Sequence, residues 1–166
     1  FFRTALSKGE DVISLFDEVL HTKSYLEIQQ IRYSDILEYS IDLPEEFEMI
    51  SLPKLTLQPL VENALYHGVK EKRGQSKITI TFDDAGDDII IQVLDDGIGM
   101  TEERLQEVKE GLKQNNNVGF GLAAVQGRLV LYFGAGYGID IWSKYGEGTR
   151  IRVRIPKKFN FLDKKI

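Results

Sequence analysis

Two adjacent runs of residues constrain the fold of this 166-residue chain more than any other feature. The run KITITFDD, residues 77–84, alternates apolar and polar side chains strictly, which is typical of a strand with one buried face. The run DDIIIQVLDDG, residues 87–97, is more apolar and is expected to be a central strand. Because AGDD between them is a turn sequence, the two runs predict an antiparallel hairpin.

The other segments show either helical or strand periodicity. Helices are expected over residues 12–33, 53–68, 101–113 and 122–133, and further strands over residues 36–43, 138–144 and 149–156. Pro53 would stand near the start of the second helix and Gly68 would stop it. Strands joined by hairpins pair antiparallel, so the sequence predicts an α+β fold. We expect a two-layer α/β sandwich with a mixed, mostly antiparallel sheet covered by helices on one face.

Composition excludes several classes of protein. Hydrophobic residues make up 42% of the chain and charged residues 28%, as in ordinary globular domains, and the net charge of −5 argues against nucleic-acid binding. The chain has no cysteine, which excludes disulfides and cysteine-based zinc sites. No apolar run reaches the length of a membrane span and no signal peptide is visible. The sequence starts FFRTALSKGED without Met, so we expect a fragment of a longer protein.

The segment LDDGIGM, residues 94–100, joins the end of the apolar strand to two glycines. Gly97 and Gly99 let the backbone turn sharply and leave room for a flat ligand. Asp95 at the strand end could accept a hydrogen bond from an exocyclic amine. A plain strand-ending turn explains the same residues, so this segment alone does not decide between the two.

Two further glycine pairs are weak signals when taken singly. GFGL, residues 119–122, opens a predicted helix, where free backbone N–H groups favour anions and the glycines would let phosphate approach. No GK[ST] follows and no strand leads directly into this segment, which excludes a Walker A loop and a Rossmann fingerprint. GEGT, residues 146–149, lies between two strands and by itself reads as a hairpin turn.

Polar groups interrupt the apolar face of LQPLVENALYHGV, residues 57–69. Asn63 and His67 lie one helical turn apart, with Glu62 and Tyr66 alongside. An amide oxygen is a hard ligand that suits Mg²⁺, an ion that keeps several waters and also binds phosphates. Asn63 would therefore hold Mg²⁺–ATP without a carboxylate's repulsion toward phosphate, although a solvated polar face also explains a lone asparagine.

The order of these motifs is more specific than any one of them. An Asn-bearing helix, then DxGxG, GxGL before a helix and GxGT between closing strands resemble the Bergerat-type ATP-binding fold, over about residues 36–156. Gyrase, Hsp90, MutL and histidine kinases share this GHKL fold. YLEIQQIRY at 25–33 and LQPLVENALYHG at 57–68 narrow the resemblance to LytS/YesM-like bacterial two-component sensor histidine kinases.

The resemblance implies ATP and Mg²⁺ as cofactors. Asn63 would be the Mg²⁺ ligand, and Asp95 would bind the adenine amino group in a pocket shaped by glycines. Residues 101–118 would form a mobile ATP lid. The cofactor-binding residues implied are Asn63, His67, Asp95, Gly97, Gly99, Gly119, Gly121, Leu122 and Thr149, with Thr149 near the adenine directly or through water.

The implied activity is that of a protein-histidine kinase, which transfers the γ-phosphoryl group of ATP to a histidine nitrogen. Glu62 and Asn63 are the candidate catalytic residues; Glu62 would orient the acceptor imidazole or a water, or else it faces solvent. The acceptor segment of such kinases resembles NPHFLFN, which this chain lacks. His21 reads as a surface or packing residue, whereas His67 would touch phosphate, or pair with Asn63 or cap Gly68. This chain is therefore expected to bind ATP without phosphorylating itself in cis.

Several positions depart from the family pattern. Pro59 stands where a second asparagine is frequent, Tyr66 where a basic residue is frequent, and Ala124 where asparagine is usual. The usual Glu-Arg-Leu reads Gly-Arg-Leu at 127–129. These changes concern phosphate contacts rather than nucleotide binding.

Two alternative functions remain. One is a GHKL-type ATPase that hydrolyses ATP, but its general-base glutamate would precede Asn63 by one turn, where this chain has Pro59. The other is a non-catalytic nucleotide-binding module. A damaged asparagine motif or adenine-binding aspartate would mark such a module, and both are intact here.

The resemblance also implies a division of the chain and its setting. Residues 1–35 would be an N-terminal helix from the dimerisation region, residues 36–156 the ATP-binding catalytic domain, and residues 157–166 a C-terminal tail. The expected partners are the dimerisation and phosphoacceptor helices of a homodimeric parent kinase and a response regulator, with no nucleic acid. The expected location is the cytoplasmic side of a membrane-anchored bacterial sensor.

Overall fold

The computed structural model describes residues 11–70, 72, 74–114 and 120–159. In this part of the chain a five-stranded sheet has the spatial order β2-β4-β5-β7-β6. Its strands are β2 (Leu37–Asp42), β4 (Ser76–Ala85), β5 (Asp88–Asp95), β6 (Gly138–Lys144) and β7 (Gly148–Pro156). Strand β2 pairs with β4 in parallel, and the other neighbours pair antiparallel. The mixed, mostly antiparallel sheet expected from the sequence is confirmed.

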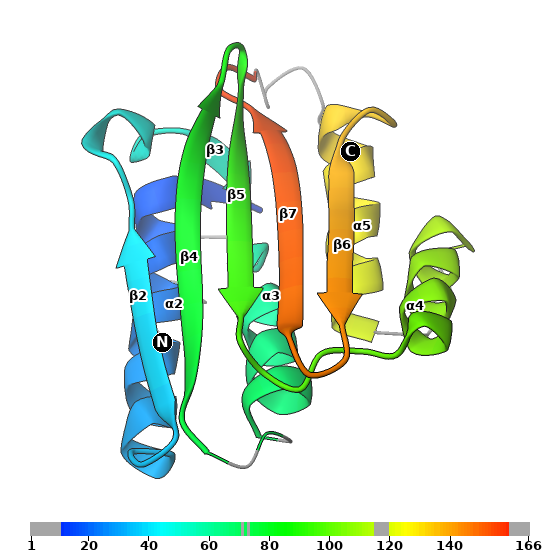
Figure 1. Cartoon of the computed structure of the whole chain (residues 1–166). Coiled ribbons are helices and arrows are strands. Elements are labelled where there is room, and N and C mark those ends of the chain that lie inside the picture. The colour runs from blue at the N-terminus through cyan, green and yellow to red at the C-terminus, as the bar shows by residue number, and fades with distance from the viewer. Residues whose placement is uncertain (1–10, 71, 73, 115–119, 160–166) are drawn as a thin grey trace.

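The predicted hairpin forms the middle of this sheet (Figure 1). Ala85 pairs with Asp88 across the two-residue turn, and β5 lies between β4 and β7. Strand β5 is central because its side chains are apolar on the inner face and half-buried on the outer face.

Helices cover one face of the sheet (Figure 1). They are α2 (Leu15–Arg32), α3 (Leu57–Asn63) and α5 (Phe120–Phe133), and α4 (Glu102–Gln114) lies beside β6. The inward side chains of the three central strands form the core against them: Ile78, Ile80, Phe82, Ile89, Ile91, Val93, Ile151, Val153 and Ile155. The two-layer sandwich expected from the sequence is therefore correct.

The second predicted helix has different boundaries. Pro53 ends a short strand, β3 (Ser51–Pro53), and α3 begins only at Leu57. Gly68 does not stop the helix, because a π-helical turn, η2 (Ala64–Val69), runs through it. Such turns are rare and widen the backbone locally.

The first predicted helix also begins later than expected. Its first residues form β1 (Val12–Ser14), which pairs antiparallel with β3. The Ser14 side chain then accepts a hydrogen bond from the Asp17 N–H at 3.1 Å and so caps α2. A 3₁₀ turn, η1 (Glu45–Phe47), lies between β2 and β3. Strands β1 and β3 have three residues each and lie far apart in the sequence, so neither shows a periodicity from which it could be predicted.

Helix α2 buries a different face from the one its apolar residues suggest. Leu15 and Leu26 are fully buried, but Phe16, Ile28 and Ile31 are 47%, 57% and 82% exposed. The remaining buried positions are polar: Glu18, Thr22 and Gln29. The buried face therefore depends on polar contacts as well as on apolar area.

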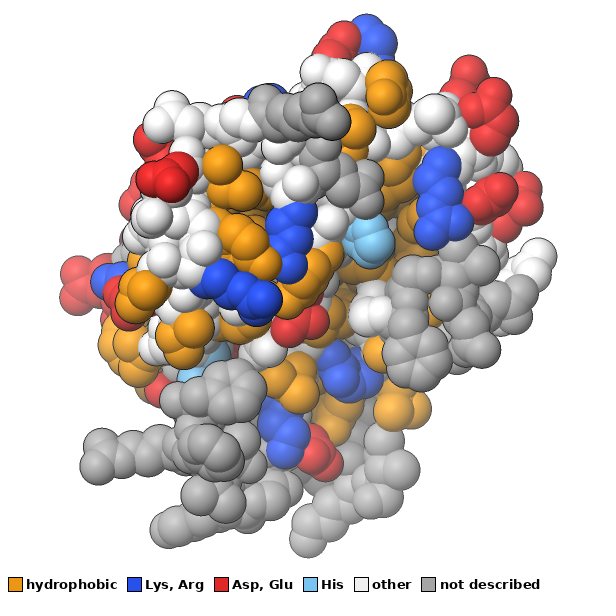
Figure 2. All heavy atoms as spheres, turned by 90° about the horizontal axis from the view of Figure 1, so that it is seen from below, with side chains coloured by type: hydrophobic (Ala, Val, Ile, Leu, Met, Phe, Trp, Pro, Cys, Tyr) orange, Lys and Arg blue, Asp and Glu red, His pale blue; other side chains and the backbone are white. Residues whose placement is uncertain are grey.

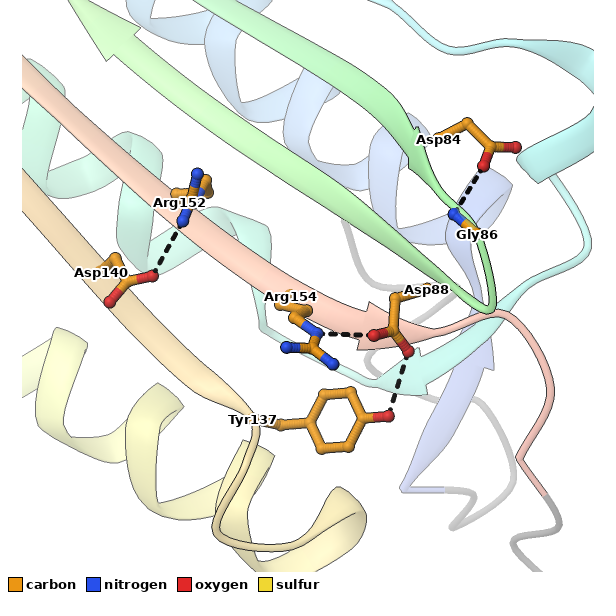
Figure 3. A network of polar contacts seen from close by, with 7 residues as sticks. All are labelled: Asp84, Gly86, Asp88, Tyr137, Asp140, Arg152 and Arg154. Carbon is orange, nitrogen blue, oxygen red and sulfur yellow. Dashed lines mark hydrogen bonds and ion pairs between the residues drawn. The ribbon is translucent and has the colours of Figure 1, made fainter.

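At the end of the sheet near the β4–β5 turn, a polar network joins β5, β7 and Tyr137, the residue before β6 (Figure 3). The Asp88 carboxylate accepts hydrogen bonds from the Tyr137 hydroxyl at 3.0 Å and from Arg154 Nε at 2.5 Å. Asp88 is 7% exposed, so these two donors satisfy a buried carboxylate far from the other end of β5.

No helix in the described ranges combines the length and the apolar character that crossing a membrane requires.

Candidate functional site

The lower end of the sheet in Figure 1 brings the sequence motifs together. Antiparallel pairing of β5 and β7 puts Asp95 directly opposite Thr149. Because alternate residues of a strand face opposite sides, both side chains point toward the helical layer, like the core residues before and after them. Asp95 is 8% exposed and Thr149 is 7% exposed. A buried carboxylate and a buried hydroxyl thus lie side by side at the end of the core.

The Asp95 carboxylate is held in place by backbone donors. Its Oδ1 accepts a hydrogen bond from the Gly97 N–H at 2.9 Å. Burial raises the pKa of the Asp95 carboxyl to about 6, while the N–H groups of Gly97 and Thr149 favour the ionised form. At neutral pH the group is therefore a buried acceptor suited to an N–H donor of a ligand.

Two glycines allow η2 to lie against this carboxylate. A Cβ on Gly68 would stand 2.8 Å from Asp95 Cγ, and a Cβ on Gly97 would overlap the backbone of Gly68. The Ile98 N–H donates to the Gly68 carbonyl at 3.2 Å, which joins the two segments. Gly68 therefore serves close approach to Asp95 and not helix termination.

Two more glycines have left-handed backbones that a side chain would strain. Gly99 has φ 67° and lies against the Lys144 carbonyl; Gly148 has φ 99° and lies against the Asp95 carbonyl. The Gly146 N–H donates to the Ile98 carbonyl at 2.6 Å. The segments DxGxG and GxGT therefore pack directly on one another.

Ser143 fixes the orientation of the Thr149 hydroxyl. Its Oγ donates to the Gly148 carbonyl at 2.9 Å, accepts from the Met100 N–H at 2.9 Å and lies 2.8 Å from Thr149 Oγ1. A serine has one hydroxyl proton, so Thr149 donates to Ser143 and keeps its lone pairs as acceptors.

A cavity of about 260 Å³ opens beside these motifs on the helical side. It is lined by His67, Ile98, Gly99, Met100, Thr101, Arg104, Val108 and Tyr145. Figure 2 views this end of the molecule and shows a histidine and hydrophobic side chains with lysine and arginine side chains around them. Asp95 and Thr149 themselves line a second hollow, of about 340 Å³, but this hollow lies on the open face, toward which Leu94, Trp142 and Arg150 point. Since the Asp95 and Thr149 side chains point to the helical layer, the first cavity belongs to the site.

The asparagine of the predicted site stands at the junction of α3 and η2. Asn63 is half-buried and His67, one turn later, lines the cavity. The neighbouring Glu62 is also half-buried, and its Oε1 accepts a hydrogen bond from Gln58 Nε2 at 2.9 Å. Glu62 is thus tied to its own helix and does not point freely into solvent.

The remaining predicted site residues lie in different surroundings. Gly121 is exposed in the first turn of α5, where a Cβ would stand 3.4 Å from the Pro59 side chain. Leu122 is 2% exposed and packs in the core, so a ligand could meet its backbone but not its side chain. Gly119 and residues 115–118 of the predicted lid lie outside the described residues. The earlier part of that lid is the helix α4, which begins with Thr101 Oγ1 accepting the Arg104 N–H at 3.3 Å.

Several residues with contacts at the site were not singled out from the sequence, although Arg104 falls within the predicted lid, residues 101–118. Met100, Arg104 and Tyr145 line the cavity, and Ser143 holds Thr149. Met100 and Tyr145 adjoin the glycine motifs, which is the one sequence signal that could have suggested them. Ser143 belongs to an ordinary strand and carries no such signal, and Arg104 was predicted only as part of the lid.

The donor set fits a nucleotide better than a resident metal. No group of three or more His, Cys, Asp and Glu side chains that could hold a metal ion occurs among the described residues. Asn63 supplies a single neutral oxygen, as expected for Mg²⁺, which usually binds through one or two protein ligands together with substrate phosphates. The buried Asp95 acceptor and the glycine-lined cradle fit a flat base that carries an amine.

Comparisons with known proteins agree with this site. Residues 52–158 match the model of the family described as histidine kinase-, DNA gyrase B- and HSP90-like ATPases. The match contains every motif on which the sequence-based resemblance rests, apart from YLEIQQIRY, so that resemblance is confirmed.

Several curated proteins are similar over nearly the whole chain. Sensor histidine kinase BtsS of Escherichia coli K12 is 32% identical over 158 residues, which covers 94% of this chain and 26% of BtsS. Sensor histidine kinase YesM of Bacillus subtilis 168 is 32% identical over 154 residues, covering 93% and 26%. Sensor protein kinase HptS of Staphylococcus aureus USA300 is 33% identical over 158 residues, covering 93% and 30%. The chain thus spans about a quarter to a third of the length of these relatives.

Solved structures share the fold at lower identity. The catalytic domain of histidine kinase ThkA matches with a TM-score of 0.62 and 18% identity, covering 88% of this chain and 96% of that one. The histidine kinase domain of the Erythrobacter litoralis EL346 blue-light activated histidine kinase matches with a TM-score of 0.60 and 19% identity, covering 89% and 63%. The family match over residues 52–158, together with the observed fold, shows that this chain belongs to the histidine kinase-, DNA gyrase B- and HSP90-like ATPases.

Proposed function

We propose that this chain is the ATP-binding catalytic domain of a sensor histidine kinase. The observation that carries the proposal is the Asp95 carboxylate, which is buried at the end of β5, packed against Gly68 and bound by the Gly97 N–H. A buried acceptor beside a glycine-lined cavity fits the adenine amino group. The similarity to BtsS, YesM and HptS favours a kinase over the other branches of the family.

In this proposal Asp95 accepts a hydrogen bond from the adenine amine, and Thr149 presents a second acceptor nearby. Gly97 and Gly99 let the base approach the backbone, while Met100 and Tyr145 supply apolar contact along the cavity. The Asp95 bond has a charged acceptor in a buried site, so it would contribute more to affinity than a surface bond.

At the phosphate end, Asn63 is the proposed Mg²⁺ ligand and His67 lines the same cavity. Mg²⁺ when bound neutralises phosphate charge. The first turn of α5, with Gly121 and the Leu122 backbone, would offer N–H groups to the phosphates, and Gly119 is proposed to bind there too. Arg104 on α4 supplies a positive charge on the lid side of the cavity.

The proposed reaction transfers the γ-phosphoryl group of ATP to a histidine nitrogen of the parent protein, with ADP as the leaving group. Catalysis would come from positioning and charge neutralisation. Glu62 would orient the acceptor imidazole, because Gln58 already fixes its carboxylate next to Asn63. Hydrolysis of ATP is disfavoured, because Pro59 occupies the place of a general base one turn before Asn63.

We further propose the setting of the domain. The acceptor histidine and dimerisation helices belong to a homodimeric parent kinase, anchored in a membrane with this domain on the cytoplasmic side, and a response regulator receives the phosphoryl group. Residues 1–35 would connect to those helices, residues 36–156 would form the catalytic domain and residues 157–166 would be a tail. Within this scheme α2 is more than a linker, because Leu15 and Leu26 belong to the core.

Titration with a fluorescent ATP analogue, with and without Mg²⁺, tests the nucleotide site. We expect Asp95→Asn to abolish binding and Asn63→Ala to remove its Mg²⁺ dependence. Wild-type protein that binds no adenine nucleotide would refute the proposal.

Phosphotransfer is tested separately by fusing the chain to the dimerisation helices of YesM and supplying labelled ATP. Glu62→Gln should lower the rate of histidine phosphorylation at unchanged nucleotide affinity. An unchanged rate would exclude Glu62 from catalysis, and no labelling of the wild-type fusion would contradict the kinase assignment.

A further inference from the structure

Glu18 carries a buried carboxyl group that the sequence predicted to lie neither in the core nor in the nucleotide site. It lies in the first turn of α2 and is 1% exposed. Its Oε1 accepts a hydrogen bond from the Leu57 N–H at 2.8 Å, and its Oε2 accepts one from the Leu55 N–H at 3.0 Å. Leu57 is the first residue of α3, the helix that carries Asn63, and Leu55 lies in the turn just before it.

Helix α3 depends on this contact because it has no cap of its own. Thr56, at the cap position, donates its hydroxyl to the Pro53 carbonyl at 2.6 Å and makes no side-chain cap bond to α3. The first N–H groups of a helix have no partner within it, and here the first of them, that of Leu57, is buried. Glu18 therefore replaces the missing cap from a different helix.

Burial raises the pKa of the Glu18 carboxyl, while the N–H groups of Leu57 and Leu55 oppose that rise.

A third helix holds the same turn from the other side. Leu55 has φ 59° and is the one non-glycine residue with positive φ in the described part of the chain. Its N–H is bound by Glu18, and its carbonyl accepts a hydrogen bond from Arg128 Nη2 of α5. The positive charge of Arg128 also attracts the Glu18 carboxylate. Glu18 and Arg128 thus hold a strained turn at both of its backbone polar groups.

The β1–β3 ribbon fixes α2 against this turn. Ser14 pairs with Ser51, and the Lys54 N–H donates to the Asp11 carbonyl at 3.0 Å. The residues just before α2 and just before α3 are therefore joined by backbone hydrogen bonds, which sets Glu18 over the start of α3.

Asn63 lies between two fixed points. It follows Leu57 by six residues, about 9 Å along a helix. At the far end, Gly68 of η2 is in close contact with Asp95 and Gly97. The Gly68 contact fixes the C-terminal end of the segment formed by α3 and η2, near Asp95. The Glu18 contact fixes its N-terminal end, and a movement of that end would displace Asn63.

We propose that Glu18 is a positioning residue of the nucleotide site: it sets the place of Asn63 by capping α3, and with Arg128 it joins α2, α3 and α5. This inference rests on the proposed role of Asn63 as the Mg²⁺ ligand. A displacement of α2 would therefore move Asn63, the proposed Mg²⁺ ligand, and leave Asp95 in place.

The decisive variant is Glu18→Gln, which keeps the shape of the side chain but only one acceptor oxygen. Either the Leu57 N–H at the start of α3 or the Leu55 N–H in the turn before it then loses its partner. We expect the affinity for a Mg²⁺–ATP analogue to fall about tenfold, the scale of coupling through packed contacts. Affinity for the same analogue in EDTA should stay within about twofold, because Asp95 is untouched. Arg128→Met, which frees the Leu55 carbonyl, should have the same selective effect.

The matched control is Asp88→Asn, which removes another buried carboxylate with two donors. Asp88 lies seven residues before Asp95 on the same strand, about 24 Å away. Thermal unfolding of all variants gives their loss of stability. A structural role alone predicts that Glu18→Gln and Asp88→Asn change Tm and leave the ratio of Mg²⁺ to EDTA affinities unchanged.

Suppose that wild type shows Mg²⁺ dependence and that Asn63→Ala removes it. If the ratio of Mg²⁺ to EDTA affinities is then unchanged in both Glu18→Gln and Arg128→Met, the inference is overturned and the proposed function stays intact. Should Glu18→Gln not fold, Arg128→Met alone decides by the same ratio. Wild-type protein without Mg²⁺ dependence would overturn both the role of Asn63 and the inference that rests on it.

Discussion

Gly68→Ala would place one methyl group between η2 and the Asp95 carboxyl. At most helical positions this change stabilises a protein by about 0.5–1 kcal/mol, because alanine restricts the unfolded chain. Here the new Cβ would stand 2.8 Å from Asp95 Cγ and closer still to Oδ1. Carbon atoms prefer a separation of about 3.5–4.0 Å, so the carboxyl has to move by roughly 0.7 Å or more.

That movement has two costs. Forcing a methyl group into packed surroundings costs about 1–3 kcal/mol. Displacing Asp95 also weakens its 2.9 Å bond from the Gly97 N–H, and a bond to a charged group contributes about 1.5–3 kcal/mol. After the gain from alanine is subtracted, we expect a net loss of about 2–4 kcal/mol in the free energy of unfolding.

Urea unfolding at pH 7 measures this loss, with Gly136→Ala as the control. A Cβ on Gly136 would meet no other atom within 4 Å, and this residue lies in a turn away from the site, so its substitution should change stability by less than about 0.5 kcal/mol. Because Asp95 moves, Gly68→Ala should also bind an ATP analogue at least about tenfold more weakly. Stability and affinity equal to or above wild type would refute the close-packing argument.

Three further predictions concern polar groups. Burial raises the pKa of Asp95 from 3.8 to about 6. The contribution of this carboxyl to folding stability is therefore present below pH 4 and is lost as the pH rises through 6. Urea titrations should show that the free energy of unfolding of wild type, relative to Asp95→Asn, falls by about 3 kcal/mol over this range. Nucleotide binding needs the ionised acceptor and should instead strengthen about tenfold between pH 5 and pH 7, a trend absent in Asp95→Asn. Ser143→Ala removes the acceptor of the Met100 N–H and the partner of Thr149, so unfolding should become easier by about 1–2 kcal/mol and analogue affinity should drop several-fold by titration. Asp88→Asn should cost about 1–2 kcal/mol in thermal unfolding and leave analogue affinity unchanged; a change in affinity would contradict the separation of the two ends of the sheet.

The elements with strong local periodicity could be read from the sequence. The hairpin of β4 and β5 formed as expected, because its alternation and turn residues lie within a short stretch. The order of the glycine motifs and the asparagine helix was enough to identify the family. The short ribbon of β1 and β3 was missed, since each strand has three residues and its partner is remote in sequence.

The candidate site was predicted in outline and not in detail. Asp95 and Thr149 were named from their motifs, and strand pairing puts them opposite one another. Ser143 was not named, because its importance comes from three hydrogen bonds to residues that a serine in a strand does not reveal. Leu122 was named with the phosphate-binding residues, yet its side chain is in the core.

The sequence by itself determined the strands of the five-stranded sheet, the hairpin and the family, because these depend on local periodicity and on motifs of a few residues. The tertiary structure alone decided what Glu18 and Gly68 do. On the sequence Glu18 is one charge on a helix, and Gly68 is a helix stop. In the fold Glu18 caps another helix and Gly68 makes room for a buried carboxylate. Both roles arise from contacts between residues far apart in the chain, and such contacts leave no periodic signal.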